Sequence, residues 1–215
     1  MGTNISGKQD IMADMTTKTL EPPKDSQGGV IRTAAFRLLL ERLTPIETGD
    51  LHQSTGISSD RLLELLDELD AAGRIRRDDS GRVVGSAGLS VVADRHEIEL
   101  DGRRFWTWCA YDILGIFGAL GASGRAISPS PGGGKTIEVQ FDRGRPVKYD
   151  AMLFRPDEEL LNCCENVYEQ WCPNSNLFAS RELAERWASR HALDGRVMDL
   201  AEAAELATAD WTEVV

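Results

Sequence analysis

The sequence predicts an α+β protein in which an N-terminal winged helix-turn-helix-like unit packs on a mixed or antiparallel sheet with helices. Two observations predict this class. Three segments with apolar residues at helical spacing come first, and a short two-strand signal follows them directly. Further two-strand signals and helical segments then alternate. We expect a disordered leader over residues 1–29, a winged-helix-like domain over 30–85 and a second domain over 86–215.

The composition excludes several classes of protein. Residues 1–29 are polar and lack the apolar core of a signal peptide, which predicts a cytoplasmic protein. No run of about 18 apolar residues is present, so no membrane partner is expected. The net charge of −11 argues against broad binding to nucleic acid or anionic lipid. In a reducing cytoplasm, four cysteines are expected to be thiols rather than disulfides.

The N-terminal elements follow from helical periodicity and turn residues. Gly73 is expected to end the third helix, and an Asp-Ser-Gly turn then predicts two strands within residues 74–85. The three helices are expected over residues 31–43, 48–54 and 59–73. Helices followed by a β-hairpin in this order are typical of a winged helix.

The charges of this unit argue against DNA binding. The would-be recognition helix carries Arg61 among four acidic residues, so it would present carboxylates to phosphate. Arg74, Arg76 and Arg77 remain at the wing, where they can still touch a DNA backbone. A structural or partner-docking role is favoured, and nucleic acid is not an expected partner. The acidic residues are Glu64, Asp67, Glu68 and Asp70.

The second region begins with a hairpin whose turn is Asp101-Gly102, a sequence that favours type I′. The glycine-rich stretch 123–135 lacks the frame of a phosphate-binding loop and is expected to connect strands. Strands are expected over residues 96–100, 103–108, 136–141 and 147–154. Helices are expected over residues 109–121, 157–171, 181–193 and 199–211, so the last third is predicted to be helical.

The cysteines are the residues with chemical potential. They stand at positions 109, 163, 164 and 172, with no CxxC pair, which argues against a structural zinc site. Thiolates prefer soft metals, so several of them can converge on one such ion. Buried, inert cysteines are the alternative. The three histidines show no metal-ligand spacing.

Asp112 gives Cys109 a neighbour on the same helix face, three residues along. A helix N-terminus favours the thiolate of Cys109, while apolar surroundings raise the pKa of the carboxyl. A thiolate beside a neutral acid suits cleavage of a bond whose leaving group is a carbanion. Alternatively, Asp112 pairs with an arginine. The aromatic residues expected to exclude water are Phe105, Trp106, Trp108 and Phe117.

Two blocks of sequence resemble the organomercurial (alkylmercury) lyase family. The first is WCAYD, residues 108–112, similar to the family motif that carries a cysteine and an aspartate. The second is WCPNSNLFASRELAERWASRH, residues 171–191, which looks like the family segment with its second cysteine. The resemblance covers roughly residues 31–195 and includes a winged-helix-like unit that does not bind DNA. It implies that residues 86–215 form an alkylmercury lyase-like catalytic domain.

The resemblance implies roles for three residues. Cys109 and Cys172 match the thiols that take the mercury of R–Hg–X, and Asp112 matches the acid that protonates the departing carbon. The products are R–H and Hg(II) held by the two thiols. No organic cofactor or catalytic metal is implied. External thiols are needed for turnover, and small thiols or a mercuric reductase accept the Hg(II).

The sequence departs from the family in one place. Many relatives have two adjacent cysteines in the second block, whereas Pro173 follows Cys172 here. The adjacent pair Cys163-Cys164 lies upstream, where it assists product transfer or belongs to a helix core. A non-enzymatic soft-metal or thiol-binding protein on the same scaffold is the alternative function. A metal-responsive transcription factor would need a basic recognition surface.

Overall fold

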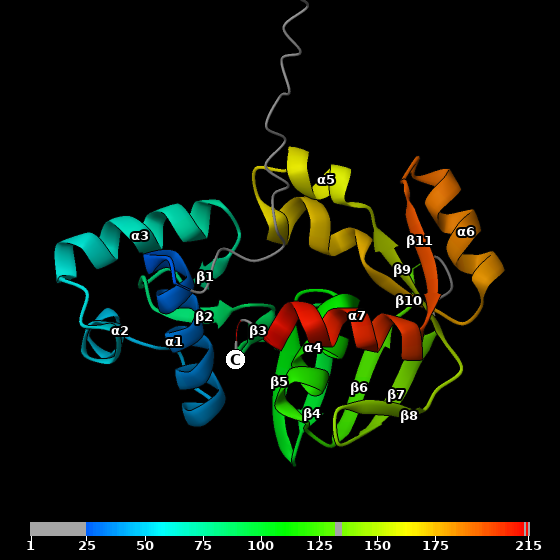
Figure 1. Ribbon diagram of the computed structural model, residues 1–215, viewed down its shortest axis with the longest axis horizontal. Helices are drawn as coiled ribbons and strands as arrows, with labels where there is room; N and C mark the ends of the chain where they lie inside the picture. The colour runs from blue at the N-terminus through cyan, green and yellow to red at the C-terminus, as the bar shows by residue number, and fades with distance from the viewer. Residues whose placement is uncertain (1–24, 132–134, 213, 215) are drawn as a thin grey trace, which may run out of the picture.

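The computed structural model describes residues 25–131, 135–212 and 214 (Figure 1). Residues 1–24 of the expected leader lie outside the described residues. The first helix begins at Gln27, where the Ser26 hydroxyl accepts a hydrogen bond from the Gly29 amide and so caps it. No described helix is long and apolar enough to cross a membrane.

Three helices and a pair of antiparallel strands form the N-terminal part, as predicted. Leucines at helical spacing form one face of the third helix, and this apolar face is buried against the first two helices. The opposite face is charged and remains exposed. The elements are α1 (Gln27–Arg42), α2 (Thr48–Thr55), α3 (Ser59–Ala71), β1 (Ile75–Arg77) and β2 (Val83–Ser86).

The sheet that begins with these strands continues into the rest of the chain. Its eight strands are ordered β1-β2-β3-β5-β4-β6-β7-β8, and every neighbouring pair is antiparallel. The expected division at residue 85 therefore falls inside one continuous sheet. The added strands are β3 (Leu89–Ser90), β4 (His96–Leu100), β5 (Arg103–Thr107), β6 (Gly124–Pro129), β7 (Thr136–Asp142) and β8 (Arg145–Lys148).

The β4–β5 turn confirms the expected type I′ geometry. Asp101 has φ 47° and Gly102 has φ 80°, the two positive values that this turn requires. The expectation that residues 123–135 only connect strands is wrong, because β6 occupies six of them and alternates buried and exposed side chains.

The last third of the chain is not purely helical, and here the sequence interpretation needs correction. The segment predicted as one strand over 147–154 is divided between the two sheets, and two further strands were missed because each is short and lacks apolar alternation. The second sheet has the antiparallel order β10-β9-β11. Its strands are β9 (Met152–Pro156), β10 (Asn176–Phe178) and β11 (Gly195–Asp199).

The helix predicted over residues 157–171 is also interrupted. It separates into α5 (Glu158–Cys163) and a single π-helical turn, η1 (Val167–Trp171), which runs into a 3₁₀ turn, η2 (Cys172–Asn174). The remaining helices are α4 (Ala110–Leu120), α6 (Arg181–Arg190) and α7 (Leu200–Thr212).

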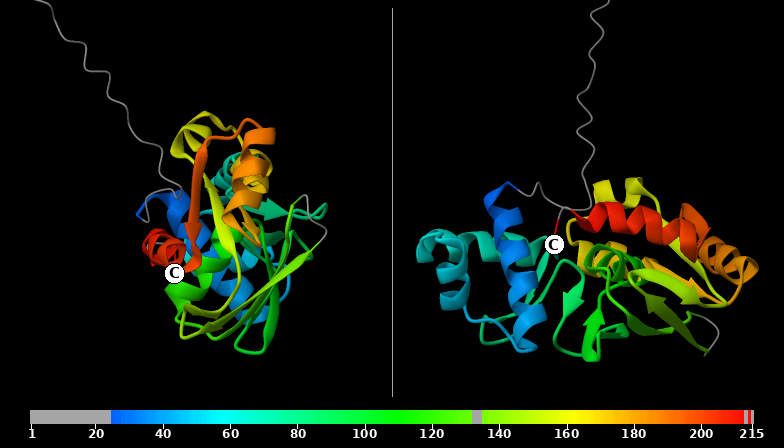
Figure 2. Two further views of the ribbon diagram at one scale, coloured as in Figure 1. Left: turned by 90° about the vertical axis from the view of Figure 1, so that its right-hand side faces the viewer. Right: turned by 60° about the horizontal axis from the view of Figure 1, so that its bottom comes forward.

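Helices α4 and α7 pack side by side on one face of the large sheet, and α6 covers the small sheet (Figures 1 and 2). Two glycines on α4 allow this close approach. A Cβ atom at Gly115 would lie 2.5 Å from the Trp211 ring, and one at Gly118 would lie 1.9 Å from the Thr208 hydroxyl. The packing of α7 holds the buried α4 in place, and the N-terminus of α4 carries the first site residue.

Candidate active site

Cys109 is the N-cap of α4, at the point where β5 ends. Its extended backbone, φ −146° and ψ 169°, stops the strand and opens the helix. The Asp112 amide donates to Cys109 Sγ at 3.4 Å, and the Cys109 amide donates to Asp112 Oδ2 at 2.8 Å. This is a capping box with sulfur in place of the usual hydroxyl. The box directs the carboxyl toward the thiol.

Cys172 reaches the same place from a distant segment of the chain. The carbonyl of Ser175 accepts a hydrogen bond from the Ala110 amide at 3.1 Å, and its hydroxyl accepts one from the Tyr111 amide at 3.2 Å. Free amides in the first turn of α4 are thus satisfied by the loop that carries Cys172. A π-helical turn directly precedes this cysteine, and such turns are frequent at functional sites.

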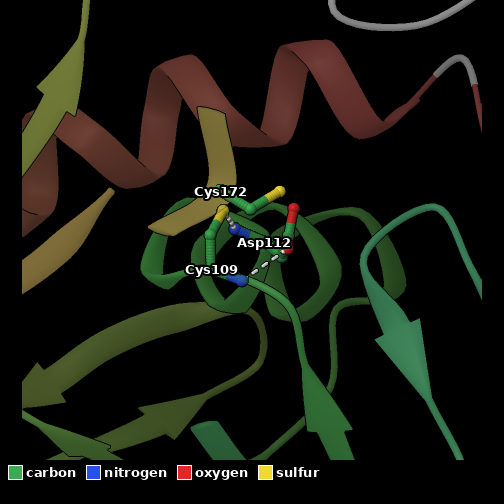
Figure 3. A group of neighbouring side chains, drawn as sticks. All are labelled: Cys109, Asp112 and Cys172. Carbon is green, nitrogen blue, oxygen red and sulfur yellow. Dashed lines mark hydrogen bonds between the residues drawn. The ribbon is translucent and has the colours of Figure 1, made fainter. Parts of the chain in front are cut away.

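The structure brings together the three residues that the sequence singled out. One Sγ each from Cys109 and Cys172 and one carboxyl oxygen of Asp112 all lie within 4.8 Å of one another, and all three residues are buried. In Figure 3 the Asp112 oxygen that does not accept the Cys109 amide points toward the Cys172 sulfur. Two soft sulfurs and one carboxyl therefore face a common point.

Burial sets the protonation of this cluster. It raises the pKa of Asp112 to about 7, although hydrogen bonds from Cys109 lower it. Burial also raises the pKa of the Cys109 thiol, and the neighbouring Cys172 and Asp112 raise it further. Near neutral pH, Cys109 therefore keeps its proton, so the expectation that the helix N-terminus favours its thiolate is wrong for the mercury-free protein. Asp112 can hold or release a proton in this range. Asp112 forms no salt bridge with any residue that the structure describes, so the alternative that it pairs with an arginine is wrong.

The wall of the site comes mainly from residues that the sequence did not indicate. Of the four aromatic residues expected there, Trp108 lines the small cavity beside the cluster. Trp171 and Trp211, which were not expected, also line this cavity. Phe117 instead stacks on Phe141. Gly88 has φ 82°, and a Cβ atom there would lie 2.4 Å from Asp112 Cγ. Only the lack of a side chain at Gly88 leaves room for the carboxyl.

Two buried arginines line the same cavity, Arg32 from α1 and Arg74 from the segment before β1. The sequence suggested that Arg74, at the wing, could still touch a DNA backbone, but the structure buries this residue, which is only 8% exposed. Arg32 was missed because a lone arginine on a helix is ordinarily a surface residue. The N-terminal part of the chain therefore completes the wall of the site.

A third arginine links the two cysteine-bearing segments. Arg95 Nη1 donates to the carbonyl of Trp108 at 3.0 Å, and Nη2 donates to the carbonyl of Tyr168 at 3.2 Å. Trp108 precedes Cys109, and Tyr168 lies in η1, one turn before Cys172. One rigid guanidinium thus fixes the separation of the two segments. The guanidiniums of Arg76 and Arg95 both pack on the Tyr168 ring.

The other two cysteines lie outside the cluster. Cys163 is exposed, whereas Cys164 is buried, and all four cysteines are free of disulfides. None of the three histidines belongs to the cluster. His96 is buried against the Ser128 hydroxyl, and burial lowers its pKa to about 3.

Comparisons with known proteins point to one family. A family model described as alkylmercury lyase matches residues 89–212. The alkylmercury lyase of Staphylococcus epidermidis is 29% identical over 179 residues, which cover 80% of this chain and 78% of that protein. The alkylmercury lyase of Bacillus cereus is 27% identical over 202 residues, covering 90% and 88%. The mercury-bound crystal structure of MerB2 shares the fold, with a TM-score of 0.77 and 24% identity over 91% of this chain and 93% of that one.

Proposed function

The chain belongs to the alkylmercury lyase family, and on that premise we propose that Cys109, Asp112 and Cys172 cleave the carbon–mercury bond of an organomercurial R–Hg–X by protonolysis. Carbon–mercury lyase activity follows from the family and its relatives. The observation that carries the residue roles is the convergence of two sulfurs and one carboxyl within 4.8 Å.

The two thiols are proposed to bind the mercury. Metal–sulfur bonds are about 2.3 Å for zinc and somewhat longer for mercury, so sulfurs this close can share one ion. Each sulfur donates electron density to the soft metal and weakens its bond to carbon. The mercury-bound state of MerB2, which has the same fold, supports mercury as the ligand. Hg(II) is the bound product and part of the substrate rather than a cofactor.

Asp112 is proposed to deliver the proton to carbon. Below about pH 7 the carboxyl already holds one, because burial raises its pKa. At higher pH the proton comes from Cys109, whose thiol must lose it when the sulfur binds mercury, and Asp112 is within reach to accept it. In the overall reaction, R–Hg–X reacts with the two thiols. The products are R–H, a mercury bis-thiolate, X⁻ and one H⁺.

Turnover is proposed to need external thiols. Two buried sulfurs hold the bound Hg(II), so another thiol has to compete for it before it can leave. This thiol belongs either to a small cellular thiol compound or to a mercuric reductase. No organic cofactor has a part in these steps. We also propose a cytoplasmic location, since four cysteines without disulfide bonds suit a reducing compartment.

The N-terminal part is proposed to be a winged-helix-like unit that does not bind DNA. Its three helices and hairpin have the order of that motif. The arginines of its wing are engaged elsewhere, since Arg76 pairs with Asp94 and Arg77 pairs with Asp67 and Asp70. Arg32 and Arg74 reach the cavity instead. The unit is thus proposed to close the active site.

Hydrocarbon release tests the proposed function. Phenylmercury and excess thiol should give benzene with the wild-type protein. Asp112→Asn should still take up one equivalent of mercury but release little benzene, because it keeps both sulfurs and loses the proton donor. Asp79→Asn, at an exposed turn, is the matched control and should behave as wild type. Stoichiometric mercury binding without hydrocarbon from the wild type would instead support the soft-metal-binding alternative.

A further inference from the structure

A tight turn between β2 and β3 lies directly against the Asp112 carboxyl. The two residues at the corner of this turn are Ala87 and Gly88. A Cβ atom built on Gly88 would lie 2.4 Å from Asp112 Cγ and 2.6 Å from Oδ1. Oδ1 is the oxygen that does not accept the Cys109 amide, and it points toward the Cys172 sulfur (Figure 3). The turn therefore borders the carboxyl oxygen that faces the proposed mercury site.

The backbone of this turn is strained. Ala87 has φ 50° and Gly88 has φ 82°, the pair of positive values that a type I′ turn requires. Glycine adopts such values readily, whereas alanine rarely does. A strained conformation persists only where surrounding groups hold it in place. Contacts from outside the hairpin are therefore expected to stabilise the turn.

Two N–H groups from other parts of the chain provide these contacts. The Trp108 amide donates to the Gly88 carbonyl at 3.1 Å. The indole Nε1 of Trp211 donates to the Ala87 carbonyl at 3.1 Å, in a buried hydrogen bond that joins residues 124 positions apart. A buried carbonyl that loses its donor is unfavourable. The indole N–H of Trp211 therefore stabilises the turn in the position that borders Asp112.

The ring of Trp211 also packs on the helix that carries Asp112. A Cβ atom at Gly115 would lie 2.5 Å from this ring, and the Tyr111 ring meets it edge to face with 5.7 Å between centroids. Gly115 follows Asp112 by three residues, so the two lie one turn apart on the same face of α4. Trp211 thus contacts both α4 and the turn, and the Asp112 carboxyl lies between these two elements.

The carboxyl needs both of these neighbours to keep its orientation. The Cys109 amide anchors Oδ2 at 2.8 Å. Rotation about the Cβ–Cγ bond of an aspartate is soft, so this hydrogen bond by itself leaves the plane of the carboxyl able to turn. The backbone of Gly88 packs against Oδ1 and restricts that rotation.

We propose that Trp211 is a positioning residue for carbon–mercury cleavage, an inference that rests on the proposed function. Its indole N–H holds the Ala87–Gly88 turn against Asp112, and the turn keeps Oδ1 directed at the mercury between the two sulfurs. Trp211 acts through the turn and takes no part in the bonds that form or break. If the turn withdraws, mercury still binds to the thiols, but the proton is delivered to carbon less often.

The sharpest test removes the N–H and keeps the shape of the side chain. A tryptophan analogue with sulfur in place of the indole N–H, incorporated at position 211, retains the packing on Gly115 and loses the hydrogen bond to Ala87. In a single turnover with phenylmercury, benzene released per mercury bound should fall about tenfold or more, because small displacements of a reacting group are costly. Mercury uptake should match that of the wild type. Full cleavage by this variant would overturn the proposal.

Two phenylalanine variants compare this tryptophan with another one. Trp211→Phe also lacks the donor and should show the same low ratio of benzene to bound mercury. Trp187→Phe removes an indole of α6 that packs on Phe154 and Phe178 of the small sheet, and it should keep the wild-type ratio. Equal ratios in these two variants would refute a specific role for Trp211.

Amide exchange in the mercury-free protein measures the turn itself. The Trp108 amide donates to the Gly88 carbonyl, so its exchange with deuterium reports how often the turn opens. The sulfur analogue at position 211 should raise this exchange rate about tenfold, because the turn loses one hydrogen bond. Unchanged exchange would overturn the proposal. A wild type that releases no benzene rejects the proposed function, whereas cleavage that is indifferent to the analogue rejects the role of Trp211 alone.

Discussion

The Cys109 amide donates to the Asp112 carboxyl at 2.8 Å, while the Asp112 amide donates to Cys109 Sγ at 3.4 Å. The first of these bonds comes from the main chain. The carboxyl therefore keeps its orientation when mercury takes the Cys109 sulfur, because its anchor does not involve that sulfur. A helix cap thus places the proposed proton donor independently of the metal that the neighbouring thiol binds.

The buried carboxyl should make folding stability depend on pH. The pKa of Asp112 rises from 3.8 to about 7 on folding. Between these values the folded state holds a proton that the unfolded state has released, so its contribution to stability is full below about pH 4 and is lost as the pH rises to about 7. Asp112→Asn lacks this titration and can still accept the Cys109 amide. We expect the unfolding free energy to shift in favour of the variant by on the order of 4 kcal/mol across this window.

Denaturant unfolding of wild type and Asp112→Asn between about pH 4 and pH 8 measures this shift. Subtracting the two curves removes the titration of every group that they share. A difference that stays constant over the whole range would show that the carboxyl titrates normally, and Asp112 would then be ionised at neutral pH.

Gly88 should be needed for the position of Asp112. Gly88→Ala places a Cβ atom 2.4 Å from Asp112 Cγ, so the carboxyl has to move. Displacement of about 1 Å can reduce a rate on the order of 100-fold. We expect a loss of that order in benzene release, with mercury uptake retained. Gly81 has nearly the same φ, 81°, and nothing within 4 Å, so Gly81→Ala is the matched control.

The two glycine variants separate backbone strain from the clash. Both should lose about 1–2 kcal/mol of stability from the left-handed conformation, and Gly88→Ala should lose a further 1–3 kcal/mol or so from overpacking. Only Gly88→Ala should lose activity. Equal activities of the two variants would mean that the Asp112 carboxyl adjusts without cost.

The sequence predicted the site better than it predicted the sheet around it. Cys109 and Asp112 are close in sequence on one helix, so local spacing was sufficient, and Cys172 followed from the family resemblance. Short strands such as β10 were missed because their hydrogen bonds come from a distant segment, β9. Arg32 and Arg74 were missed for the same reason, since local sequence does not show which surface residue another part of the chain will bury.

The wing arginines should not support DNA binding. Arg76 pairs with Asp94, whose side chain is only 2% exposed, and Arg77 pairs with Asp67 and Asp70 on α3. Freeing them for phosphate would break these pairs. We therefore expect no salt-dependent binding to duplex DNA, measured by fluorescence anisotropy at about 50 and 200 mM salt, the range in which phosphate contacts weaken steeply. Affinity that falls steeply between these concentrations would restore a regulatory role.

Arg95 should act as a positioning residue for the two thiols. Its guanidinium bridges the carbonyls of Trp108 and Tyr168 at 3.0 and 3.2 Å, so removing it lets the two cysteine-bearing segments separate. Arg95→Met should still bind an organomercurial through one thiol. Its hydrocarbon release should fall about tenfold or more, because cleavage needs both sulfurs around the same ion.

Two comparisons distinguish positioning from a general loss of stability. Arg95→Lys can reach only one carbonyl at a time, so its rate should lie between those of wild type and Arg95→Met. Arg104→Met, which removes an exposed arginine of β5 paired with Glu97, should cleave at the wild-type rate. The decisive measurement is the ratio of hydrocarbon released to mercury bound in a single turnover. A purely structural role lowers both quantities together and leaves this ratio unchanged, whereas wider thiol spacing lowers cleavage alone.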